Sequence, residues 1–306
     1  MEFLPSLLKP RWLTRVVNTA MRALLSSIFL CSLSTLGLAQ DARLLEQSWV
    51  VDEVERTAWV RVPELEGDSK APLVFAWHGH GGSSRASSRS FKTHEHWPEA
   101  IVVYPQGLKT PGFYDPEGRR SGWETKAKAD ENKDLKFFDV MLADFLERGI
   151  VDERRIHSTG HSNGGGFTYT LLFERGSVFA SMAPSSSAVP RSYRRSQPEH
   201  VPIFHLAGEA DDVVLMRWQQ PAINALLRYN ECGEPVRWAG HPLCKLYPSE
   251  VGAPADAIVH ANGAACLAEV CNVNANAIRL QQGPRHDSAV AIRPSAVDYK
   301  SEIEWR

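Results

Sequence analysis

The segment RIHSTGHSNGGGFTYTLLF, residues 155–173, contains the pentapeptide Gly160-His161-Ser162-Asn163-Gly164. Residues 155–160 have the character of a strand, and residues 164–173 have the character of a helix. A serine flanked by glycines at a strand-to-helix turn lies on a sharp, strained bend that exposes its hydroxyl. The start of the following helix directs backbone N–H groups at negative charge that develops nearby. The segment therefore indicates Ser162 as a candidate nucleophile.

Short apolar runs on both sides of this segment have the composition of strands. They cover residues 49–51, 57–62, 73–77, 101–104, 179–183, 203–207 and 257–259. Helical periodicity is present in residues 134–146 and 218–229. Strands that alternate with helices predict an α/β fold with a mainly parallel central sheet flanked by helices. The charged run KAKADENKDLK, residues 126–136, is then expected to be a solvated loop that enters a helix.

The overall composition excludes several classes of protein. The chain has 306 residues, a formal charge of −2 and a hydrophobic fraction of 43%, which argues against a disordered chain. A nearly neutral chain lacks the basic surface that a nucleic-acid-binding protein needs. The cysteines have no matching histidine pair at zinc spacing, and no phosphate loop or dinucleotide fingerprint is present. We therefore expect no metal, no cofactor and no nucleic-acid partner.

The first 39 residues have the pattern of a secretory signal. Met21-Arg22 precede an apolar run over residues 23–36, and Gly37-Leu38-Ala39 supply a cleavage site. The run is too short to span a bilayer, so we expect no integral membrane span after cleavage and a secreted or periplasmic protein. An uncleaved N-terminal anchor is the alternative. The predicted organisation is a signal region at 1–39, an α/β domain at 40–260 and an atypical C-terminal tail at 261–306.

Export would place the remaining cysteines in an oxidising compartment. Four cysteines follow the signal region, which permits two disulfides. The local pairing joins Cys232 to Cys244 and Cys266 to Cys271, but two other pairings and four unpaired thiols stay open.

A glycine-rich loop follows the predicted strand at 73–77. Its sequence is His78-Gly79-His80-Gly81-Gly82, and its glycines allow the backbone to approach a substrate carbonyl closely. Hydrolases that use a serine on such a turn take one oxyanion donor from this loop and one from the residue after the nucleophile, here Asn163. His78 itself is expected to be structural and to bond the loop backbone.

Two adjacent carboxylates follow the predicted strand at 203–207. Asp211 and Asp212 lie at the C-terminal end of that strand, where ligand chemistry occurs in open α/β sheets. One of them can orient a catalytic histidine and stabilise its charged form. The other reading is a helix cap or a turn aspartate, which suits Asp212 well.

Six sequence blocks, taken together and in order, resemble a known family. The blocks are AWHGHGGS (76–83), VVYPQGL (102–108), SGW (121–123), GHSNGGG (160–166), FASMAPSS (179–186) and GEADDVV (208–214). They are similar to the secreted polyhydroxybutyrate depolymerases and feruloyl/acetylxylan esterases, which are α/β-hydrolases. The resemblance implies an exported serine esterase that cleaves polyhydroxyalkanoate or acyl-polysaccharide esters, so the expected partner is a small or polymeric ester. By position, it implies Ser162 as nucleophile, Asp211 as acid, and His80 and Asn163 as oxyanion residues.

The position of the catalytic base, a histidine in the family, does not match the family pattern in this sequence. The family places its histidine in a loop after the last strand, near position 264, which is Ala264 here. His260, at the end of the predicted strand, is the best candidate, followed by His286 and then His241. A changed reading frame near the 3′ end of the gene and a diverged tail would each explain the missing histidine.

Other function classes stay open at this stage. Without a base, the chain would be a catalytically impaired or non-catalytic binding protein on a hydrolase scaffold. An acyltransferase would use the same acyl-enzyme. The basic loop Arg191-Ser192-Tyr193-Arg194-Arg195 could bind an acidic substrate, although exposed basic loops are common. The tryptophans at 97, 123, 218 and 238 are expected in the core, with Trp123 the best candidate for a polymer-binding exception. The ester itself and the oligomeric state are not predicted.

Overall fold

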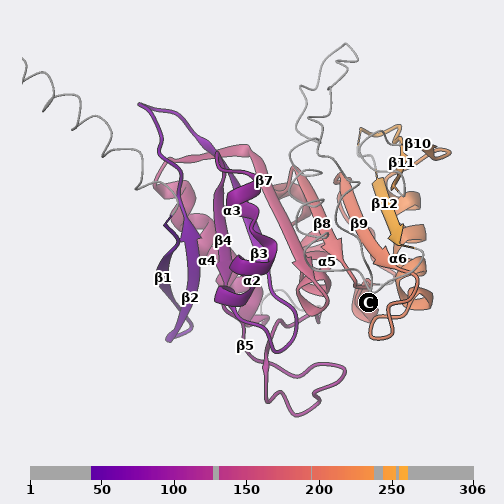
Figure 1. The fold of residues 1–306 in the computed structure, drawn as a ribbon, viewed down its shortest axis with the longest axis horizontal. Helices are drawn as coiled ribbons and strands as arrows, with labels where there is room; N and C mark the ends of the chain where they lie inside the picture. The colour runs from indigo at the N-terminus through magenta and orange to yellow at the C-terminus, as the bar shows by residue number, and fades with distance from the viewer. Residues whose placement is uncertain (1–42, 127–130, 194, 238–243, 253–254, 261–306) are drawn as a thin grey trace, which may run out of the picture. The chain divides into compact units, whose positions relative to one another are not determined.

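A computed structural model describes residues 43–126, 131–193, 195–237, 244–252 and 255–260, with the backbone alone described for Arg237, for Cys244 and for 255–260. The chain divides into a unit at residues 1–43 and a unit at residues 44–306, and the fold below is that of the second. Its central element is a ten-stranded sheet in the order β1-β2-β4-β3-β7-β8-β9-β12-β11-β10 (Figure 1).

The middle of the sheet is parallel and both edges are antiparallel. The parallel strands, in order across the sheet, are β4 (Ile101–Pro105), β3 (Ala71–Trp77), β7 (Val151–His161), β8 (Ser181–Ser185), β9 (Ile203–Gly208) and β12 (Ala255–His260). The antiparallel edges are β1 (Leu45–Val51) with β2 (Val54–Arg61), and β11 (Cys244–Tyr247) with β10 (Val236–Arg237). A separate small sheet pairs β5 (Leu108–Lys109) with β6 (Ser121–Gly122).

Helices cover both faces of the sheet. They are α2 (Ser84–Phe91), α3 (Thr93–His96), α4 (Lys133–Glu147), α5 (Asn163–Arg175) and α6 (Met216–Tyr229), with short 3₁₀ turns η1 (Gly176–Val178) and η2 (Arg191–Tyr193). Strand β3 is buried along its whole length because alternate side chains enter two different cores. Leu73, Phe75 and Trp77 pack with α4 and α5, whereas Val74 and Ala76 pack with Phe91 at the end of α2.

The fold confirms the predicted α/β arrangement, with differences in individual elements. β8 begins two residues later than predicted, at Ser181, and β7 begins four residues earlier, at Val151. Helix α2 was not predicted, because its sequence SRASSRSF has no apolar stripe. It buries three serines and Phe91, and Ser83 caps its start by accepting a hydrogen bond from Ala86 N at 3.1 Å.

The charged run at 126–136 enters a helix as predicted, because α4 begins at Lys133, but part of its described end is buried and not solvated. Asn132 is buried and caps α4 through hydrogen bonds from the N–H groups of Asp134 and Leu135. The Asp134 carboxylate is fully buried, 2.7 Å from the guanidinium of Arg56, and it also accepts a hydrogen bond from Glu124 N at 2.8 Å. A buried carboxylate is tolerated when it is paired in this way. The predicted solvent exposure was wrong for Asp134 because its partner, Arg56, lies 78 residues away in sequence.

Several predictions fall outside the described residues. The signal region at 1–39, the tail at 261–306 and three of the four cysteine side chains are not described, so cleavage, tail origin and disulfide pairing stay predictions. In the part of the chain that the structure describes, no helix has both the length and the apolar character needed to cross a bilayer.

Candidate active site

Ser162 lies at the turn between β7 and α5 in a backbone conformation that few residues other than glycine adopt. Its φ is +55° and its ψ is −117°. Gly160 and Gly164 must be glycines because the backbone of another residue lies too close to each of them for a side chain to fit. A Cβ on Gly160 would overlap the carbonyl of Gly164, and a Cβ on Gly164 would overlap the carbonyl of Trp77. The turn is held by a hydrogen bond from Ser162 N to Ser185 O at 2.9 Å. A turn with this geometry exposes the serine hydroxyl, as a candidate nucleophile requires, and we refer to it as the nucleophile turn.

The glycine-rich loop after β3 packs against this turn. His78 holds the loop, because its Nδ1 lies 2.8 Å from Gly79 O and its Nε2 accepts a hydrogen bond from Gly107 N at 3.0 Å. Burial lowers the pKa of His78, which favours the neutral ring that this pairing needs. His78 therefore has the structural role expected from the sequence.

Two backbone N–H groups are available at the expected oxyanion positions. The Asn163 side chain is occupied on both sides, since its Oδ1 accepts from Trp123 N at 2.7 Å and its Nδ2 donates to Trp123 O at 3.0 Å. Within the described residues, the backbone N–H of neither Asn163 nor His80 donates a hydrogen bond to another protein group. Both residues line the same cavity as Ser162.

The His80 side chain connects this loop to the segment between β5 and β6. Its Nε2 lies 3.0 Å from Oδ2 of Asp115. The pKa of Asp115 is lowered to about 2, chiefly by the hydrogen bond from Arg119 N and then by His80. The ring also packs closely against Gly112 and Gly122, where a Cβ would crowd it. Asp115 thus anchors the β5–β6 segment to the loop that carries His80.

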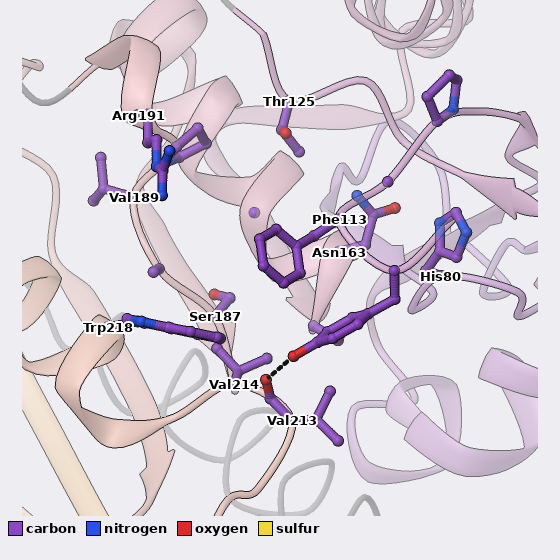
Figure 2. Close-up of a pocket in the computed structure, with 17 residues that line it drawn as sticks. His80, Phe113, Thr125, Asn163, Ser187, Val189, Arg191, Val213, Val214 and Trp218 are labelled. Carbon is purple, nitrogen blue, oxygen red and sulfur yellow. Dashed lines mark hydrogen bonds between the residues drawn. The ribbon is translucent and has the colours of Figure 1, made fainter. Parts of the chain in front are cut away.

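A cavity of about 380 Å³ opens above Ser162. Figure 2 shows His80 and Asn163 on one side of it, Val189 and Arg191 on the other, and Phe113 between them. The walls are mainly apolar and aromatic, as is usual for sites that bind small organic groups. The lining residues are His80, Pro111, Gly112, Phe113, Tyr114, Thr125, Ser162, Asn163, Gly166, Ser187, Ala188, Val189, Pro190, Arg191, Val213, Val214 and Trp218.

The aromatic part of the wall differs from the sequence prediction. Trp97 and Trp123 are buried, and Trp123 is fixed by a hydrogen bond from its Nε1 to His78 O at 2.8 Å. Trp218, which was expected in the core, is 36% exposed at the cavity, and its ring centroid lies 5.9 Å from that of Phe113. Trp238 lies outside the described residues. Sequence reasoning missed Phe113 because an apolar pair in a polar loop has no periodicity to identify it.

The carboxylate of Asp211 is fixed beside this cavity. Its side chain is buried, and Oδ1 accepts hydrogen bonds from Val213 N at 3.0 Å and Val214 N at 2.8 Å. Asp212 is exposed. The turn hydrogen bonds that the sequence made plausible for Asp212 therefore belong to Asp211. Because one oxygen of Asp211 holds the turn, Oδ2 is the oxygen left to orient a histidine.

His161, the variable residue of the pentapeptide, lies in the electric field of Asp211. Its Nδ1 is 3.2 Å from Ser185 Oγ. Burial lowers the pKa of His161, and the negative charge of Asp211 partly opposes that shift. This histidine was not among the candidate site residues, because the pattern G-x-S-x-G accepts any residue at its position.

The candidate base is described by its backbone alone. His260 is the last residue of β12, paired with Gly208 of β9, and Asp211 follows Gly208 in a turn closed by Asp211 N to Gly208 O at 3.2 Å. The sheet therefore brings the backbones of His260 and Asp211 to neighbouring positions at one edge. His241, His286 and Ala264 lie outside the described residues.

Known proteins that are similar to this chain in sequence or in structure include several esterases. No family model matches the chain. The chain is 26% identical over 147 residues to a bifunctional acetylxylan esterase/xylanase of Neocallimastix patriciarum, an alignment that covers 47% of this chain and 20% of that protein. It is 25% identical over 168 residues to feruloyl esterase B of Piromyces equi, covering 52% and 30% respectively. A solved ferulic acid esterase superposes with a TM-score of 0.56 at 14% identity, over 79% of this chain and 98% of that one.

The protein has the α/β-hydrolase fold. The resemblance to feruloyl and acetylxylan esterases is confirmed, whereas the resemblance to polyhydroxybutyrate depolymerases stays a prediction. The chain spans less than a third of the length of the two curated relatives named here. In this α/β-hydrolase the candidate site lies at the carboxyl edge of the parallel strands, where ligand chemistry occurs in open α/β sheets.

Proposed function

We propose that this α/β-hydrolase is a serine esterase that cleaves carboxylic esters through an acyl-enzyme. The observation that supports it best is the backbone conformation of Ser162, which has a positive φ. Ser162 lines the same cavity as His80 and Asn163, whose backbone N–H groups are available as donors. Strain of this kind persists only where surrounding structure maintains it, and it is concentrated at functional sites.

In the proposed reaction, Ser162 Oγ attacks the ester carbonyl carbon and His260 takes the hydroxyl proton. The backbone N–H groups of His80 and Asn163 bind the oxyanion. The carbon–oxygen bond to the alcohol then breaks, and the alcohol leaves with the proton from His260. Water attacks the acyl-enzyme with the same histidine as base, which releases the acid and restores Ser162. Asp211 orients His260 throughout.

The substrate class follows from the wall of the cavity and from the relatives. Two of the named relatives are feruloyl or ferulic acid esterases. Phe113, Tyr114 and Trp218 offer aromatic surface to a planar acyl group. We infer that an aromatic acyl ester such as methyl ferulate is a better substrate than an acetyl ester. The predicted signal at residues 1–39 supports an activity outside the cytoplasm.

The test begins with turnover and covalent labelling. We expect the protein to hydrolyse methyl ferulate and p-nitrophenyl butyrate and to be labelled by a fluorophosphonate at Ser162. Ser162→Ala and His260→Ala should each remove most of the activity, and the double variant should lose little more, because the two residues act as a unit. Activity should fall at acid pH as the imidazole becomes protonated.

Other results would change the assignment in defined ways. Full activity in His260→Ala with none in Ser162→Ala would move the base to His286. Transfer of the acyl group to an added alcohol in preference to water would indicate an acyltransferase. Absence of both turnover and labelling would contradict the esterase proposal and favour a non-catalytic binding protein on the same scaffold.

A further inference from the structure

One wall of the cavity ends at the positively charged side chain of Arg191. The wall is the segment from Ser187 to Arg191, which follows β8 and contributes five consecutive residues to the lining. Ala188, Val189 and Pro190 form its apolar middle. Among the side chains that line the cavity, Arg191 is the one that carries a permanent charge; the imidazole of His80 is paired with Asp115.

The inner end of this wall lies beside the nucleophile turn. Ser187 packs against the first turn of α5, where a Cβ on Gly165 would lie 2.5 Å from Ser187 Oγ. The Ser187 hydroxyl is buried and has no hydrogen-bond partner in the described residues. Four residues of extended chain span at most about 14 Å, so Arg191 lies within one small molecule's length of Ser187.

The Arg191 guanidinium has no carboxylate partner among the residues that the structure describes. Arg191 is exposed, at the start of η2, and Figure 2 places it across the cavity from His80. A guanidinium presents a planar pair of donors that matches a carboxylate. An unpaired guanidinium above apolar walls therefore favours a ligand that is apolar near the reacting ester and anionic at its other end.

We propose that the cavity selects esters that carry a free carboxylate and that Arg191 binds this carboxylate. The proposal rests on the proposed esterase function and names the substrate class of the same site. It does not require the carboxylate to be on a particular half of the ester, and the test distinguishes the two halves.

Two pairs of chromogenic esters, each with one charged and one neutral member, measure the effect of a substrate carboxylate on turnover. Mono-p-nitrophenyl adipate against p-nitrophenyl hexanoate places the charge on the acyl half, and 3-carboxy-4-nitrophenyl butyrate against p-nitrophenyl butyrate places it on the alcohol half. In at least one pair, we expect kcat/KM for the charged member to exceed that for the neutral member. Arg191→Gln should lower kcat/KM for the charged member by about five- to tenfold and change the neutral member by less than about twofold.

Two further comparisons separate charge from packing. Arg195→Gln, at an exposed position that does not line the cavity, should leave both ratios unchanged. The preference of the parent protein should shrink when ionic strength rises from about 0.05 M to about 0.5 M, because salt screens a partly exposed ion pair. Equal loss on charged and neutral esters in Arg191→Gln, or no preference for the charged member in either pair, would overturn the proposal.

A binding experiment keeps this inference separate from the esterase proposal. The Ser162→Ala protein is titrated with monomethyl adipate and with dimethyl adipate, and binding is followed by tryptophan fluorescence. Tighter binding of the monomethyl ester that is lost in Ser162→Ala/Arg191→Gln supports carboxylate recognition even if the parent protein has no turnover. Equal binding of the two esters contradicts it even if turnover is present.

Discussion

The phenol of Tyr114 donates a hydrogen bond to the carbonyl oxygen of Val213 at 2.9 Å, and so joins two loops that are 99 residues apart in sequence (Figure 2). Tyr114 belongs to the segment between β5 and β6, which Asp115 anchors to His80. Val213 belongs to the turn that the Asp211 carboxylate holds after β9. The bond therefore connects the segment that is anchored to His80 with the turn that carries Asp211.

Removal of this bond should affect substrate binding more than the chemical step. Tyr114→Phe keeps the ring beside Phe113 but loses a solvent-exposed hydrogen bond worth about 0.5–1.5 kcal/mol. We expect KM for methyl ferulate to rise about two- to fivefold with kcat nearly unchanged, because the reacting groups stay in place. Tyr229→Phe, on α6 and outside the cavity lining, is the control. A large loss of kcat with unchanged KM would show that the bond positions catalytic groups instead.

The nucleophile turn should not tolerate a methyl group at its second glycine. Gly164→Ala places a Cβ against the carbonyls of Trp77, the last residue of β3, and of His78, the first residue of the loop that follows. We expect a loss of about 1–3 kcal/mol in the free energy of unfolding, measured by urea denaturation, together with weaker fluorophosphonate labelling of Ser162. Gly233→Ala, where the nearest atom is 4.0 Å away, should have little effect. Wild-type stability and labelling in Gly164→Ala would show that the turn relaxes more easily than its contacts indicate.

The orienting carboxylate should be Asp211 and not Asp212. Asp211→Asn keeps an oxygen that can accept from Val213 N and Val214 N, so the turn should survive. The amide removes the negative charge that stabilises a protonated histidine, and kcat should fall by about 10⁴-fold. Asp212→Asn is the matched control, because Asp212 is exposed. Normal activity in Asp211→Asn with loss in Asp212→Asn would reverse the assignment.

Two buried histidines should make the fold sensitive to mild acid. Burial lowers the pKa of His157 to about 3 and that of His205 to about 4, from an ordinary value of 6.5. Below pH 6.5 the unfolded chain therefore binds protons that the folded chain does not. Stability should be full above pH 6.5 and should fall as the pH decreases from 6.5 toward 4.

The urea midpoint measured across this pH range checks the prediction. His205→Gln should reduce the pH dependence, whatever its effect at neutral pH. His200→Gln, at an exposed position, should leave the slope unchanged. The same slope in His205→Gln and in the parent would mean that His205 does not contribute.

Several features of the candidate site could be predicted from short stretches of consecutive residues. Gly160-His161-Ser162-Asn163-Gly164 specifies a sharp turn because backbone sterics at the two glycines act within a few residues. The loop from His78 to Gly82 and the pair of aspartates after β9 were recognised in the same way, since strand ends and glycine-rich loops are local signals. Alternation of short apolar runs with helical periods was enough for a mainly parallel sheet.

Other features required chain segments that are distant in sequence. Arg56 and Asp134 bury their charges together, and composition alone made residues 126–136 appear solvated. Trp218 and Phe113 meet at the cavity although 105 positions separate their numbers, and Arg191 proved to be part of its lining. A side chain's burial and partners depend on what the folded sheet places opposite it. Local sequence therefore determined the nucleophile turn, whereas tertiary packing decided which aromatic and charged groups surround it.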